Sequence, residues 1–175
     1  NMDFNTLHDK SKFSSINGNF KDIEIKNLGF SYDNEKNVLN NISLNISSGQ
    51  KIGIIGSSGS GKTTLVNIIL GLLRPSNGDI LIDGKSIFNN LDSWHEFIGY
   101  IPQDIYLLND TIKNNIALGI EEKNIELKNI ENALLSSNSK QFVENLPNNI
   151  DTNVGNRGIA ISGGQKQRIG IARAF

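Results

Sequence analysis

Residues 56–63 read Gly-Ser-Ser-Gly-Ser-Gly-Lys-Thr, a glycine-rich run that ends in a cation and a hydroxyl group. Glycine lets the backbone turn so that successive N–H groups point inward at an anion, and the N-terminus of a following helix adds partial positive charge. Lys62 would reach the outer phosphates of a nucleotide, and the Thr63 hydroxyl would bind Mg²⁺. The run is therefore typical of a phosphate-binding loop. Its members are Gly56, Ser57, Ser58, Gly59, Ser60, Gly61, Lys62 and Thr63.

A second glycine-bearing helix start lies far along the chain, at Ser162, Gly163 and Gly164. Serine is a favoured N-cap residue, and the two glycines leave the backbone free to expose its N–H groups. A hydroxyl group, exposed N–H groups and the helix dipole together favour an anion. The sequence thus predicts two separate helix starts that suit phosphate.

Composition narrows the classes of protein that could carry these two stretches. The chain has 175 residues, a net charge of −1, no cysteine and 37% hydrophobic residues, which indicates one soluble globular domain. The balanced charge gives no basic footprint for nucleic acid, and the lack of cysteine excludes disulfides and thiolate metal sites. No apolar run approaches the roughly 18 residues of a membrane span, and no signal peptide is visible.

Hydrophobic periodicity predicts the elements that would position the phosphate-binding loop. Residues 51–55 form a short apolar run before the loop, which predicts a strand, and apolar residues recur at helical spacing from Lys62 to Leu73. The other predicted strands are 23–28, 42–46, 79–82 and 98–101. The other predicted helices are 111–118, 125–136, 141–146 and 164–175.

Ser162-Gly163-Gly164-Gln165, followed by Lys-Gln-Arg, resembles the signature motif of ABC ATPases. Two shorter stretches resemble other parts of that family. Residues 29–32, Gly-Phe-Ser-Tyr, resemble its aromatic loop, in which Tyr32 would stack on adenine. Residues 100–104, Tyr-Ile-Pro-Gln-Asp, resemble its Q-loop, in which Gln103 would touch Mg²⁺ or the attacking water.

Two further stretches are similar to the exporter branch of this family. Residues 105–112 look exporter-like, and residues 152–158 resemble the loop that precedes the signature motif in exporters. The chain carries Asn153 and Asn156 where the family usually has glutamates. This departure removes negative charge from a surface expected to meet the coupling helices of the membrane part.

The resemblance implies an α/β fold: a P-loop NTPase core with an N-terminal antiparallel β subdomain and a helical subdomain at about 111–147. Residues 1–20 would link an upstream transmembrane domain to a partial ATP-binding domain over 21–175. Two such domains would dimerise head to tail with ATP and Mg²⁺ between them. The residues implied to bind ATP in cis are Tyr32, Gly56, Ser57, Ser58, Gly59, Ser60, Gly61, Lys62, Thr63, Thr64 and Gln103. The residues implied to complete the partner's site are Ser162, Gly163, Gly164 and Gln165.

The resemblance also implies roles in catalysis. Lys62 and Gln103 would act in the reaction, and Thr63 and Gln103 would hold Mg²⁺. The helical run that reaches Phe175 shows no stop signal, so we expect the domain to continue. The Mg²⁺-binding aspartate, the general-base glutamate and the switch histidine of the family would follow. We expect this stretch alone to bind nucleotide weakly without hydrolysing it, and the intact parent to be an ATPase.

The leading hypothesis is the ATP-binding domain of an ABC exporter at the cytoplasmic face of the cell membrane, with a transmembrane domain fused upstream and no nucleic acid partner. A soluble ABC-type ATPase acting on nucleic acid or ribosomes is the alternative, which a coiled-coil insertion or a basic surface would favour. A P-loop kinase or GTPase would leave Ser162–Arg168 without a role. A non-catalytic regulatory module would lack the glutamate.

Overall fold

The computed structural model describes residues 20–32 and 37–175, and its contacts divide the chain into two units, Asn1–Ile98 and Gly99–Phe175. The linker expected at residues 1–20 lies, apart from its last position, outside the described residues. Among the helices that are described, none combines the length and the apolar character that crossing a membrane would require.

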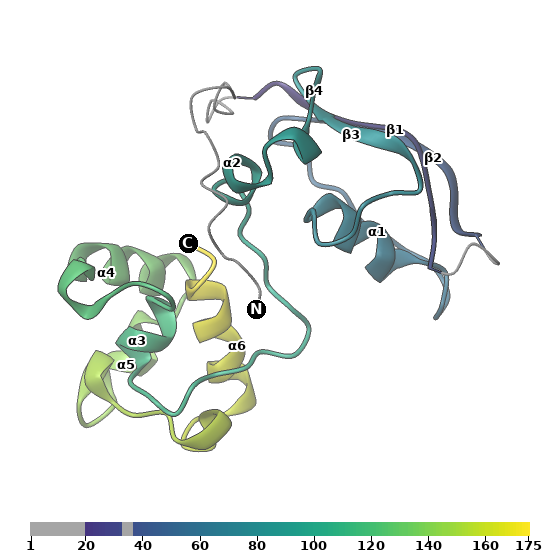
Figure 1. Ribbon diagram of the computed structural model, residues 1–175. Helices are drawn as coiled ribbons and strands as arrows, with labels where there is room; N and C mark the ends of the chain where they lie inside the picture. The colour runs from purple at the N-terminus through teal and green to yellow at the C-terminus, as the bar shows by residue number, and fades with distance from the viewer. Residues whose placement is uncertain (1–19, 33–36) are drawn as a thin grey trace, which may run out of the picture. The chain divides into compact units, whose positions relative to one another are not determined.

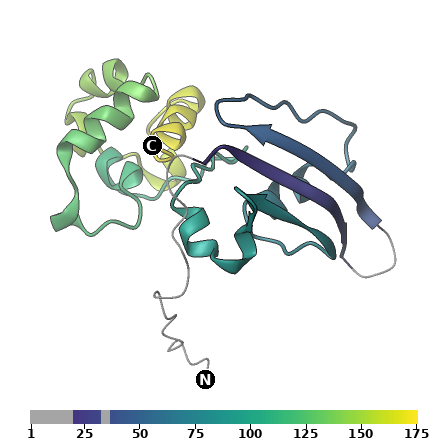
Figure 2. The ribbon, with the colours of Figure 1, turned by 90° about the horizontal axis from the view of Figure 1, so that it is seen from above.

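The first unit is built on an antiparallel sheet with the strand order β2-β1-β3-β4. The central strand β1 pairs with β2 on one side and β3 on the other, so that Ile25 lies opposite both Leu44 and Ile80 (Figure 2). The alternating patterns in the sequence predicted β1, β2 and β3, and the strands extend beyond the predicted ranges. Their bounds are β1 Asp22–Ser31, β2 Asn37–Ser47, β3 Asn77–Ile82 and β4 Lys85–Ser86.

Helix α1 (Lys62–Ile69) packs on this sheet and follows the phosphate-binding loop directly (Figure 1). Ile68 of α1 is fully buried in the same core as Ile25 and Ile80. The predicted helix over 62–73 is real but ends earlier, because the chain turns through Gly71 at a φ of 74°. The core therefore fixes the helix whose N-terminus carries the loop.

A short helix that the sequence did not predict holds the other end of α1. In α2 (Leu91–His95), the buried Trp94 donates from its indole Nε1 to the carbonyl oxygen of Ile69 over 2.7 Å. The His95 Nε2 lies 2.8 Å from the carbonyl oxygen of Leu70. Helix ends leave carbonyl groups without partners, so these two side chains satisfy the C-terminus of α1. A 3₁₀ turn at Ile87–Asn89 precedes α2.

The strands predicted at 51–55 and 98–101 are wrong for this structure, because neither segment is a strand. Both runs have the apolar composition of a strand covered on two faces. A strand exists only through a hydrogen-bonded ladder with a neighbour, and no segment within 20–32 or 37–175 pairs with either run. The side chain of Ile55 is accordingly 95% exposed.

The second unit is helical. Its helices are α3 Ile112–Ile116, α4 Leu127–Ser136, α5 Lys140–Glu144 and α6 Gly163–Ala172, with 3₁₀ turns at Glu122–Asn124, Asn149–Asp151 and Asn156–Gly158. Helix α6 packs against α3 and α4, and Ile112 and Ile169 are fully buried between them (Figure 1). The predicted helices are therefore present, although α3, α5 and α6 end earlier than expected.

Candidate functional site

The phosphate-binding loop is shaped by two glycines in the left-handed region of backbone conformation. Gly59 has a φ of 78° and Gly61 a φ of 89°. Gly61 is the N-cap of α1, and no side chain caps this helix end. The first N–H groups of a helix have no partner within the helix, so the start of α1 presents free backbone donors. These donors and the helix dipole make the loop suitable for an anion.

Lys62 places its charge inside the loop. Its Nζ donates to the carbonyl oxygens of Gly56 over 2.9 Å and Ser57 over 2.6 Å. Nζ also donates to Ser60 Oγ over 3.4 Å, and no ion pair found among the described residues includes Lys62, so neutral oxygen atoms surround the ammonium. A cation without a carboxylate partner can exchange these carbonyl groups for phosphate oxygens.

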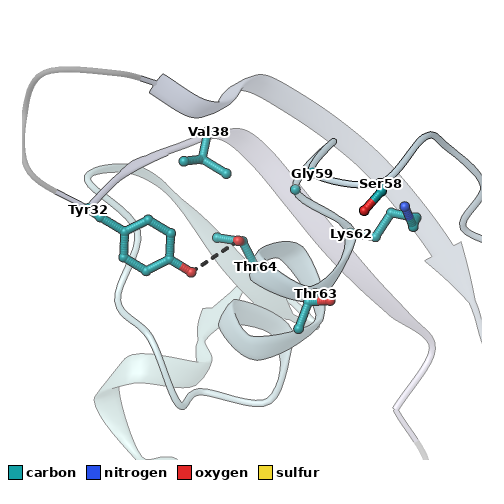
Figure 3. Close-up of a pocket in the computed structure, with 8 residues that line it drawn as sticks. Tyr32, Val38, Ser58, Gly59, Lys62, Thr63 and Thr64 are labelled. Atoms are coloured by element: carbon teal, nitrogen blue, oxygen red, sulfur yellow. Dashed lines mark hydrogen bonds between the residues drawn. The ribbon is translucent and has the colours of Figure 1, made fainter. Parts of the chain in front are cut away.

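A pocket of about 470 Å³ joins the loop to a tyrosine that lies far from it in sequence (Figure 3). The Tyr32 hydroxyl lies 3.2 Å from Thr64 Oγ1, and the Tyr32 ring meets Phe30 edge-on with centroids 4.8 Å apart. Tyr32 is still 60% exposed, so its ring remains accessible to a ligand. The pocket is lined by Tyr32, Val38, Ser58, Gly59, Gly61, Lys62, Thr63 and Thr64.

The pocket lining fits a nucleoside polyphosphate. It offers an ammonium group, hydroxyl groups and free N–H groups to an anion, and an aromatic ring to a base, and none of the described residues that line it carries a carboxylate. The sequence did not predict Val38 as a site residue. It reads only as an apolar residue near the start of a strand, β2. Within the described ranges, no three His, Cys, Asp or Glu side chains gather to hold a metal. Thr63 could hold Mg²⁺ through its hydroxyl group if oxygens of a bound phosphate and water supplied further ligands.

The second helix start, at the beginning of α6, has a preformed turn over residues 162–165, the signature turn. The Ser162 N–H donates to Gln165 Oε1 over 2.9 Å, and the Gln165 N–H donates to Ser162 Oγ over 3.3 Å, which is a capping box. Ser162 Oγ accepts this bond, so its own proton stays free for another acceptor. A Cβ atom added to Gly163 or Gly164 would meet no other atom within 4 Å, so this surface is open.

The expected site residues thus fall into two groups. Tyr32 and residues 56–64 come together in the first unit. Gln103, which is exposed, and residues 162–165 belong to the second unit.

Comparison with known proteins places these features in one family. The family model described as "ABC transporter" matches residues 39–175. An ABC transporter ATP-binding protein of Bacillus subtilis is 39% identical over 95% of this chain, which covers 28% of that protein. The ATP-dependent lipid A-core flippase of Pseudomonas aeruginosa is 40% identical over 87% of this chain, which covers 26% of that protein. The chain therefore spans about a quarter of the length of these relatives.

A solved structure, a bacterial Atm1-family ABC exporter with ATP bound, matches 94% of this chain with a TM-score of 0.83 and 34% identity, over 28% of the exporter chain. The fold of the chain agrees with this match. The chain belongs to the ABC transporter family, as an ATP-binding domain of the exporter type.

Proposed function

We propose that this chain binds ATP with Mg²⁺ and that its parent protein hydrolyses ATP to export or flip a substrate across a membrane. The observation that carries the proposal is the pocket of the first unit, where an ammonium group with no carboxylate partner among the described residues, the free N–H groups at the start of α1 and an exposed tyrosine ring line one cavity. Few ligands other than a nucleoside polyphosphate combine a flat base with several negative charges.

In this proposal each residue of the pocket has a separate task. The ring of Tyr32 stacks on adenine, and the N–H groups of residues 56–64 hold the phosphates. Lys62 exchanges its carbonyl partners for the outer phosphates, and Thr63 binds Mg²⁺ through its hydroxyl. Bound Mg²⁺ would neutralise charge that develops on the phosphates. Gln103 would complete the Mg²⁺ site or orient the attacking water.

The signature turn acts on the nucleotide of a second ATP-binding domain. The free proton of Ser162 and the open N–H groups of Gly163 and Gly164 would donate to the γ-phosphate held by the partner's loop. Gln165 keeps the turn in shape through the capping box. ATP then joins the two domains head to tail, and hydrolysis releases them.

The exporter role requires a membrane part in the parent protein. Relatives more than three times as long as this chain are named as an ABC transporter ATP-binding protein and a flippase, and we place the domain at the cytoplasmic face of the membrane. On the second unit, Tyr106 is 58% and Leu108 is 42% exposed, just after the proposed Q-loop. We propose that this pair of side chains, the Tyr106/Leu108 pair, contacts the transmembrane domain.

Two measurements test the proposal. A fluorescent ATP analogue should bind this chain with Mg²⁺, and Lys62→Met should weaken binding at least about tenfold, because charge-assisted bonds contribute about 1.5–3 kcal/mol. Steady phosphate release should appear only with the full-length parent in lipid nanodiscs. Unchanged analogue binding by the Lys62→Met variant, or no hydrolysis by the parent, would contradict the proposed function. Lys62-dependent release from this chain alone would contradict the expectation that it is inactive.

A further inference from the structure

A polar side chain is completely buried in the helical unit, and the ATP-binding roles above do not use it. Asn115 of α3 has no exposed surface. Its Oδ1 accepts from the Leu108 N–H over 2.8 Å, and its Nδ2 donates to the carbonyl oxygens of Leu108 over 3.1 Å and Thr111 over 2.9 Å. These bonds fasten the backbone of the loop that carries the Tyr106/Leu108 pair. A buried amide with this many partners fixes one backbone path.

Arg173 joins the same loop to the end of the signature helix. It follows α6 directly, and its guanidinium donates three hydrogen bonds. Nε donates to the Asn115 carbonyl oxygen over 2.8 Å, Nη1 to the Tyr106 carbonyl oxygen over 3.0 Å, and Nη2 to Asn115 Oδ1 over 3.3 Å. Burial lowers the pKa of the Arg173 guanidinium, which stays charged at neutral pH.

The packing beside Arg173 brings the loop against α6. A Cβ atom on Gly170 would lie 2.5 Å from Ile105 Cδ1, so only glycine at this position permits the approach. Ile105 and Leu107 point into the core, while Tyr106 and Leu108 alternate with them and face outward. The loop is thus held on its buried side by the packing of Ile105 and Leu107, and along its backbone by hydrogen bonds from Asn115 and Arg173.

We propose that Arg173 is a positioning residue that couples the Tyr106/Leu108 pair to the signature turn at Ser162. The two features lie at opposite ends of one helix. Helix α6 begins at the signature turn, and its C-cap residue Arg173 donates to the carbonyl oxygen of Tyr106 in the loop. A shift imposed on the loop by the membrane part would therefore move α6 and the signature turn with it. This inference rests on the proposed function, because it needs a transmembrane domain that contacts the pair.

A second arginine of α6 provides a matched control. Arg168 donates to the Asn138 carbonyl oxygen over 3.2 Å and lies 5.1 Å from the centroid of the Phe142 ring. It therefore ties α6 to the turn between α4 and α5, and no bond found for it reaches the 105–111 loop. Arg168→Gln removes a guanidinium tether from the same helix while leaving the proposed coupling intact.

The test is a double-mutant cycle on kcat for ATP hydrolysis by the full-length parent in lipid nanodiscs, corrected for the folded fraction. Arg173→Gln and Tyr106→Ala should each lower kcat and leave KM for ATP nearly unchanged, because the residues that bind ATP in cis are untouched. The effects of residues that act along one path are not additive. The kcat of the double variant, as a fraction of the wild-type kcat, should therefore be at least about twofold higher than the product of the fractions for the two single variants. Arg173→Lys, which keeps the charge and fewer bonds, should fall between the wild-type and Arg173→Gln proteins.

The outcomes separate the inference from the proposed function. Non-additivity of Arg173→Gln with Tyr106→Ala, together with additivity of Arg168→Gln with Tyr106→Ala, supports the coupling role. Additive effects of both arginines with Tyr106→Ala, or equal non-additivity of both, would overturn it while leaving the ATPase assignment in place. A parent that hydrolyses no ATP before any substitution would instead overturn the proposed function.

Discussion

The two left-handed glycines of the phosphate-binding loop differ in what surrounds them, and alanine substitutions should separate the two costs. A Cβ atom on Gly59 would meet nothing within 4 Å. A Cβ atom on Gly61 would lie 2.9 Å from Leu39 Cδ2 and 3.1 Å from the Val38 carbonyl oxygen. Gly59→Ala should therefore cost backbone strain alone, whereas Gly61→Ala should also push the loop away from β2.

The magnitudes follow from the geometry. A non-glycine residue in the left-handed region costs about 1–2 kcal/mol, which we expect for Gly59→Ala. Overpacking adds about 1–3 kcal/mol, so Gly61→Ala should lower the free energy of unfolding by about 2–5 kcal/mol. Val38 and Gly61 both line the pocket, so Gly61→Ala should also weaken nucleotide binding more than Gly59→Ala does.

Urea unfolding of this chain followed by tryptophan fluorescence would measure the difference. Trp94 is the single tryptophan of the sequence and is buried beside α1, so its emission reports on the unit that carries the loop. Equal slopes with different midpoints would identify a change in stability alone. Equal midpoints for the two variants would refute the close approach of Gly61 to β2, and a lower midpoint for Gly59→Ala would refute the reasoning altogether.

Three further predictions concern the contacts around the two units. Trp94→Phe removes the indole donor to Ile69 and should cost about 1–3 kcal/mol of stability, measured by circular dichroism in urea; an unchanged midpoint would contradict it. Tyr32→Phe should keep most of the affinity for an ATP analogue, because the ring remains, whereas Tyr32→Ala should lose about 1–3 kcal/mol; equal losses would argue against stacking. The Lys140 ammonium holds the pKa of the Glu131 carboxyl below its usual 4.5. The contribution of the Lys140–Glu131 ion pair to stability is therefore complete above pH 4.5 and is lost as pH falls through the lowered pKa. The unfolding midpoints of Glu131→Gln and the wild-type protein should thus converge in acid, and a constant gap between them would contradict this.

The phosphate-binding loop was readable from sequence because its function depends on backbone conformation. Only glycine adopts the φ of 78° and 89° at positions 59 and 61 without strain, so the residue types reveal the geometry. The same holds for Ser162, whose N-cap role and capping box with Gln165 are local interactions along a few residues. The prediction of the strands β1 and β2 succeeded for a similar reason, since the alternation of apolar and polar residues is a local signal.

The strand at 51–55 could not be decided this way. Its apolar composition is that of a strand, yet a ladder needs a neighbour, and the described part of the chain supplies none. Helix α2 also escaped prediction, because five residues carry little periodic signal and its role lies in the bond from Trp94 to the end of α1. In both cases the outcome depended on partners distant in sequence.

The sequence by itself determined the backbone shape of the loop at 56–63 and of the turn at 162–165, because each is a run of consecutive residues whose types dictate the backbone. Only the tertiary structure decided that Tyr32 hydrogen-bonds Thr64, that Val38 lines the pocket, and that Arg173 hydrogen-bonds the backbone of the loop at Tyr106. Each of these contacts joins residues far apart along the chain. Hydrophobic burial of a complete unit brings such residues together, and no local pattern records which of them will meet.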